Sequence, residues 1–200
     1  MKRTTGYFNV AVFFDRDLPY KNNFFLIGSP FLMDYFFERA VVYVPLHDEQ
    51  GSMGFILNRK MKGVSLPAVI HELPEEINIP VYVGGPVSMN SLFWIHTLPD
   101  IPDAIKIGDG IYMGGKSSEI IKAVKEGILT KDNLKCFLGY SGWGKNQLLR
   151  ELKEGSWVVI PASKDIIFKD GDKIDWRDLT WIKGGLTRLL SQIPDNIHYN

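Results

Sequence analysis

The sequence predicts a globular protein of the α+β class. Its 200 residues suit one domain, and 45% of them are hydrophobic, which is enough for a large core. Turn residues join some of the short apolar runs, while helical patterns join others. This order favours α+β over a purely parallel α/β sheet. No linker divides residues 1–200, so we expect one domain, with a core at about 20–165 and a C-terminal helical region at about 175–193.

The first ordered elements should be a strand and then a hairpin. "FFLIG" is typical of a strand, and "FLMDYFFER" is either a short helix or an irregular aromatic segment. "AVVYVPLH" and "SMGFILNR" read as two strands joined by the turn "DEQG", in which Gly51 suits a left-handed position. The hairpin should place Asn58 and Arg59, at the end of its second strand, close to Arg39, where its first strand begins.

The later elements are strands, a second hairpin and helices. Strands are expected at "IPVYVGGPV", "SLFWIHTL", "LKCFLGYSGW" and "WVVIPA", a short edge strand at "DIIF", and a hairpin at "AIKIGDGIYMGG". Helices are expected at "SLPAVIHELPEE" with Ser65 as the N-cap, at "SSEIIKAVKEG" with Ser117 or Ser118 as the N-cap, and at "NQLLRELKEG". "DWRDLTWIKGGLTRLLSQI" should be a terminal helical region broken at Gly184–Gly185.

Two glycine-rich strings imitate catalytic or binding motifs. "GIYMGGKS", residues 110–117, has the spacing of a phosphate-binding loop, which makes nucleotide binding one hypothesis. Its "IYM" favours a strand, however, so we interpret the string as a strand entering a helix. "LGYSGWG" approaches the G-x-S-x-G nucleophile elbow around Ser141, but Trp143 stands where the motif needs a glycine. We therefore predict no catalytic residue and lean against an enzyme.

Charge and composition limit the remaining classes of function. Lysine plus arginine and aspartate plus glutamate are both 23, and this balance makes direct nucleic-acid binding a weak hypothesis. The one cysteine and four scattered histidines show no metal-site spacing, and we predict neither a metal nor a cofactor. The N-terminus lacks the long apolar run of a signal peptide, and no stretch is long enough to cross a membrane. We therefore expect a cytoplasmic protein.

Several motifs together carry a resemblance to a known family. They are "SPFLMDYFFERAVVYVPLHDEQGSMGFILNR", then "VYVGGPV", then "FLGYSGWGKNQLLRELKEGSWVVIPA". In order and spacing this combination, from about residue 28 to about 162, resembles the AlgH/YqgE family of bacterial proteins. The resemblance implies a mixed, mostly antiparallel bifurcated sheet that curls into a partial barrel with flanking helices. The family has no established enzymatic activity that the resemblance could transfer to this chain. Some members of the family are labelled as transcriptional regulators.

Two main hypotheses for function follow. The first is a non-enzymatic binding or regulatory protein with a protein partner or a small ligand. The alternative is a small-ligand or anion-binding protein, or an unrecognised enzyme, with a polar site at the hairpin ends and glycine turns. The candidate ligand-binding residues are Arg39, Asn58, Arg59, Gly84, Gly85 and Ser141. Arg39 and Arg59 have a structural alternative, which is pairing with Asp34 or Asp48.

Overall fold

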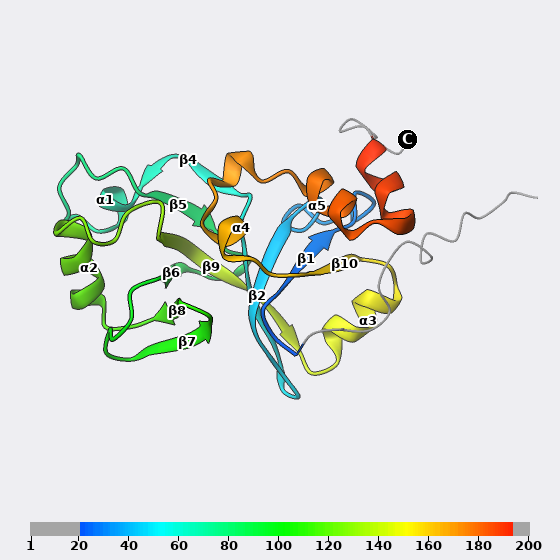
Figure 1. Cartoon of the computed structure of the whole chain (residues 1–200), viewed down its shortest axis with the longest axis horizontal. Helices are drawn as coiled ribbons and strands as arrows, with labels where there is room; N and C mark the ends of the chain where they lie inside the picture. Colours follow the sequence, from blue (N-terminus) through cyan, green and yellow to red (C-terminus); the bar gives the residue numbers. More distant parts are fainter. Residues whose placement is uncertain (1–20, 194–200) are drawn as a thin grey trace, which may run out of the picture.

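The computed structural model describes residues 21–193, and ten strands make up its sheet (Figure 1). Along the main path the strand order is β10-β1-β2-β3-β9-β6-β8-β7, and β4 and β5 branch from β9. The strands are β1 (Phe24–Gly28), β2 (Val41–Asp48), β3 (Gly51–Ile56), β4 (Lys60–Ser65), β5 (Pro80–Val83), β6 (Val87–His96), β7 (Ala104–Gly108), β8 (Ile111–Gly114), β9 (Leu134–Gly144) and β10 (Trp157–Pro161). All pairings but one are antiparallel, and the exception is β5 with β9. The sheet curls into a half-barrel with flanking helices, so the predicted fold class is confirmed.

The sheet divides at β9, the longest strand. The second half of β9 pairs with β3, while its first half pairs with β5 on one edge and with β6 on the other. The backbone N–H of Ile56 donates to the carbonyl of Gly84 at 3.0 Å and joins the end of β3 to the end of β5. A single strand therefore belongs to both branches.

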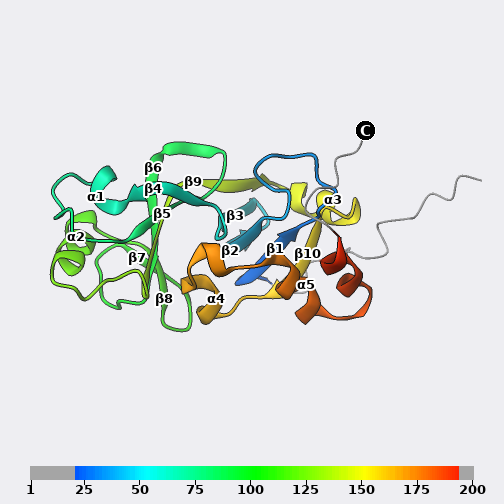
Figure 2. The same cartoon turned by 90° about the horizontal axis from the view of Figure 1, so that it is seen from above.

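The helices lie around this sheet. They are α1 (Leu66–Val69), α2 (Ser117–Lys125), α3 (Gln147–Lys153), α4 (Lys164–Phe168) and α5 (Trp176–Lys183), with 3₁₀ helices η2 (Gly171–Lys173) and η3 (Gly185–Gln192). Helix α2 lies at one end of the molecule and α3 at the other (Figure 1), and α4 and α5 lie along one side of β1 and β2 (Figure 2). No helix within 21–193 has both the length and the apolar character that a membrane crossing requires.

Both faces of β1 and of residues 41–45 of β2 are buried, which explains their continuous apolar runs. Alternate residues point to opposite faces. One set, including Phe25 and Tyr43, packs in the main core with Ile167 of α4 and Leu179 of α5. The other set, including Phe24, packs in a second core with residues of α3. A third core lies beneath α1 and α2.

A glutamate anchors the second core. The carboxylate of Glu151 on α3 accepts hydrogen bonds from the indole N–H groups of Trp143 and Trp157, each at 2.8 Å. Both indoles are almost fully buried. Because a buried donor without a partner is costly, this carboxylate fixes α3 against β9 and β10.

Four expectations from the sequence need correction. The helix expected at "SLPAVIHELPEE" is the single turn α1, because Pro74 disfavours helix before it and only Leu66 and Pro67 of α1 are buried. "DIIF" lies in the helix α4 and is not a strand, since so short an apolar run has no distinctive period. Lys116 takes the N-cap position of α2 in place of the predicted serines. Strand β4, with its polar sequence, was not predicted.

The C-terminal region breaks where predicted. Helix α5 ends before Gly184, whose φ is +78°, and η3 follows. Trp176, Leu179 and Leu190 are buried, whereas Trp181, Ile182 and Leu189 are at least half exposed. The side chain of Leu186 and the N-terminal segment 1–20 lie outside the described residues.

Candidate functional site

Three of the predicted site residues lie together at the base of the β2–β3 hairpin. Asn58 holds them in place: its amide donates to the carbonyl of Arg39 at 3.0 Å, and its side-chain oxygen accepts from the N–H of Val41 at 2.9 Å. Arg59 donates to the carbonyl of Glu38 at 2.6 Å. The predicted proximity of Arg39, Asn58 and Arg59 is thus confirmed.

These residues line a concave site of about 350 Å³, which we call the arginine pocket. Its lining residues are Glu38, Arg39, Asn58, Arg59, Trp176 and Arg177. The last two come from α5, more than 100 positions away in the sequence, and no sequence pattern linked them to the hairpin. Glu38 was also missed, although it precedes Arg39 directly.

The charged groups of the arginine pocket hold one another in position. Arg39 forms an ion pair with Glu38 at 3.1 Å, and Arg177 pairs with Asp175 at 3.4 Å. The guanidinium carbons of Arg39 and Arg177 lie 5.9 and 5.3 Å from the centre of the Trp176 ring, in cation–π contact.

Two partners considered from the sequence have other contacts. Asp34 accepts the N–H groups of Phe36 and Phe37. Asp48 accepts those of Gln50 and Gly51. Each carboxylate therefore stabilises its own turn.

The other three predicted site residues lie elsewhere, where the chain crosses β9. Strands β5 and β6 flank β9, so the link through Gly84 and Gly85 must pass over it. A Cβ on Gly84 would lie 2.2 Å from the carbonyl oxygen of Gly139, and one on Gly85 would lie 2.4 Å from the backbone of Tyr140. The buried hydroxyl of Ser141 donates to the carbonyl of Gly84 at 3.0 Å. The close approach that glycine permits here is to the protein's own backbone.

The structure also explains the two glycine-rich strings. Residues 111–114 form β8, which pairs with β6 and β7, and α2 follows, as the strand-to-helix interpretation predicts. Lys116 is exposed, and its backbone N–H donates to the carbonyl of Pro102 at 2.7 Å. Ser141 lies within β9 and not at a strand-to-helix turn. Residues 21–193 contain no group of three or more His, Cys, Asp or Glu placed to hold a metal ion.

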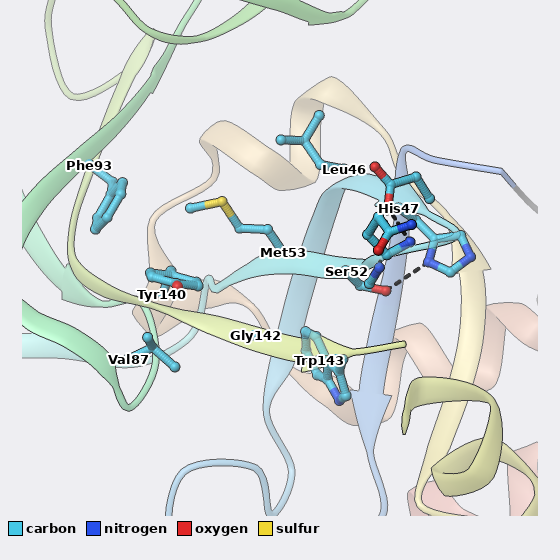
Figure 3. A pocket seen from close by; sticks show the side chains of 13 residues that line it. Leu46, His47, Ser52, Met53, Val87, Phe93, Tyr140, Gly142 and Trp143 are labelled. Carbon is cyan, nitrogen blue, oxygen red and sulfur yellow. Dashed lines mark hydrogen bonds between the residues drawn. The ribbon is translucent and has the colours of Figure 1, made fainter. Parts of the chain in front are cut away.

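A larger concavity, the hairpin groove, lies at the opposite end of the β2–β3 hairpin (Figure 3). Its volume is about 760 Å³, and it is lined by Leu46, His47, Asp48, Gln50, Gly51, Ser52, Met53, Val87, Phe93, Tyr140, Gly142, Trp143 and Gly144. Leu46 and Met53 are cross-strand partners, as are His47 and Ser52, which are joined by a 2.7 Å hydrogen bond. The two pairs lie on opposite sides of the hairpin, because neighbouring residues alternate.

A buried lysine lies apart from both concavities. Lys135 on β9 is 3% exposed, and its Nζ donates to the carbonyl of Lys169 at 2.6 Å. The same amine lies 4.5 Å from the centre of the Tyr82 ring. Burial lowers the pKa of Lys135 from 10.5 to about 7. Nothing in the apolar run "LKCFLGY" distinguished this lysine from a solvated one.

Comparisons with known proteins agree with this architecture. The AlgH-like family profile matches residues 25–186. A UPF0301 protein of Parabacteroides distasonis is 39% identical over 177 residues, covering 88% of this chain and 89% of the relative. One from Chlorobium limicola is 37% identical over 171 residues, with 85% and 90% covered.

Two solved structures share the fold. The solution structure of AlgH from Pseudomonas aeruginosa has a TM-score of 0.67 and 26% sequence identity, and the match covers 97% of this chain and 99% of the AlgH chain. A crystal structure of a Corynebacterium diphtheriae protein has a TM-score of 0.70 at 23% identity, with 88% and 94% covered. The resemblance seen in the sequence motifs is confirmed: the chain belongs to the AlgH-like family.

Proposed function

We propose that this protein is a non-enzymatic binding protein whose ligand is a small anion, a carboxylate or a phosphate, held in the arginine pocket. One observation carries the proposal. Three arginines and one glutamate line the same small concavity. Guanidinium groups present paired N–H donors that match the oxygens of carboxylate and phosphate.

The arginines are ordered before any ligand arrives. Arg59 is bonded to the backbone at Glu38, and Arg39 and Arg177 are each held by a carboxylate and by contact with Trp176. Side chains fixed in this way lose little further freedom on binding, which favours affinity. The side chain of Arg39 is only 15% exposed, so its charge is screened less than that of a surface arginine.

The test is thermal melting of the full chain with inorganic phosphate, citrate and Mg-ATP. An anion at about 100 times its dissociation constant adds about 2.7 kcal/mol of stability, which raises the Tm of a chain of this size by roughly 5–10 °C. Arg59→Gln should abolish this rise. Arg150→Gln removes the same charge from the exposed face of α3 and should leave the rise unchanged.

Two results would contradict the proposal. One is the absence of saturable binding by any of the three anions. The other is an equal response in wild type and Arg59→Gln. A response to Mg-ATP alone that disappears in Lys116→Ala would instead assign binding to residues 110–117.

A further inference from the structure

We infer that the hairpin groove is a second ligand site, which takes an organic amine with an apolar body. The inference depends on a contrast between the two concavities. The arginine pocket is lined by three cations and one anion, whereas in the described part of the chain Asp48 is the only acidic side chain in the groove lining, and neither lysine nor arginine lines it.

The inner part of the groove is apolar, and its side chains are held by packing against the main core. Met53, Phe93 and Tyr140 are partly buried and pack against the main core. The rings of Phe93 and Tyr140 meet edge to face, with centroids 5.5 Å apart. Leu46 stands opposite Met53 in the strand register and is 36% exposed (Figure 3). An aromatic or branched aliphatic group would cover these side chains, which otherwise contact water.

The polar end of the groove is the hairpin tip. The Oδ1 of Asp48 accepts N–H groups from Gln50 at 2.7 Å and Gly51 at 3.2 Å, so the turn holds the carboxylate at the rim. The His47–Ser52 pair lies on the other side of the hairpin, so Asp48 alone supplies the charge at this end. A carboxylate at one end of an apolar groove complements a ligand with an ammonium group at the end of an apolar body.

The volume suits a ligand of this kind. About 760 Å³ lies within the range of pockets that hold drug-sized molecules. Because Asp48 is exposed at the hairpin tip, the charged end of the ligand can keep part of its hydration while the apolar end is covered.

The experiment compares 4-phenylbutylamine with 4-phenylbutyrate, two probes that share the apolar body and differ in charge. Binding to the full chain is followed by amide chemical shifts at low salt. The amine should bind roughly three- to five-fold more tightly, which is what one partly exposed charge pair contributes. Its perturbations should map to the hairpin tip and to Tyr140.

Three variants locate the site. Asp48→Asn keeps an acceptor oxygen for the turn and removes the charge, so the two probes should bind this variant with equal affinity. Leu46→Ser should weaken the binding of both probes. Ile182→Ser removes an exposed apolar side chain on α5 and should change neither affinity. Equal affinity of the two probes at the groove in wild type, amine-induced shifts confined to other parts of the chain, or no saturation by the amine would overturn the inference. Arg59→Gln should leave amine binding intact, which separates this inference from the proposed anion site.

Discussion

Replacing Lys135 by methionine should remove a pH dependence of stability that wild type has. In the folded protein the Lys135 pKa is about 7, whereas an unfolded chain has the ordinary value of 10.5. Between these values the folded amine is neutral and the unfolded amine holds a proton. The unfolded state then binds more protons, so stability rises with pH, by about 1.4 kcal/mol per pH unit at most.

The magnitude follows from the two pKa values. From about pH 7 to about pH 8.5 the free energy of unfolding should rise by about 1.6 kcal/mol because of this group. Higher pH is unsuitable for the test. Burial raises the pKa of Cys136 and of Tyr43. These groups act with the opposite sign, because unfolding lets them lose a proton at about pH 9 and above.

Urea unfolding at the two pH values is the assay, with wild type, Lys135→Met and Lys62→Met. Methionine fills a volume similar to that of lysine. The variant lacks the hydrogen bond to the Lys169 carbonyl at both pH values, so this loss cancels in the comparison. The difference in the free energy of unfolding between wild type and Lys135→Met should therefore change by about 1.6 kcal/mol between the two pH values. Lys62, an exposed lysine on β4, should give no such change. If Lys135→Met kept the wild-type slope, the lysine would be charged in the folded protein and the reasoning would fail.

Two further predictions concern packing. Gly84→Ala places a Cβ 2.2 Å from the carbonyl oxygen of Gly139 and should cost about 3 kcal/mol in thermal or urea unfolding. Gly144→Ala, whose Cβ would have 3.9 Å to its nearest neighbour, should cost under about 1 kcal/mol, and similar losses would refute the steric argument. Glu151→Ala leaves two buried indole N–H groups without an acceptor and should cost about 2–4 kcal/mol. Glu154→Ala, an exposed change at the end of the same helix, should cost little, and an equal loss in both would contradict the anchoring role.

Local patterns predicted the strands and hairpins well because their signals lie within a few residues. The continuous apolar runs of β1 and of residues 41–45 of β2 reflect burial on both faces. The "DEQG" turn sets the hairpin, so the proximity of Arg39 to Asn58 could be predicted. The strand predicted at "DIIF" was wrong, because an apolar run of four residues does not distinguish a strand from a helical turn.

The candidate site could be predicted only in part because two of its six lining residues come from a distant segment. Trp176 and Arg177 reach the arginine pocket through the packing of α5 on the main core. Gly84 and Gly85 were predicted as ligand-binding residues, whereas the close approach that the structure shows there is by the backbone of Gly139 and Tyr140. The hairpin groove was not predicted, since its residues come from separate strands and no single motif links them.

The crossing of β9 by the chain at Gly84–Gly85 has a consequence for the order of folding. Strands β5 and β6 are each complete by residue 96, yet the strand that fits between them begins at residue 134. Until β9 arrives, both have an open hydrogen-bonding edge and cannot close on each other without excluding it. On a ribosome that delay lasts for the synthesis of about 40 residues, a few seconds at typical elongation rates. Insertion of β9 pairs residues that lie 38 to 55 positions apart in the sequence, so we expect it to limit the rate of folding.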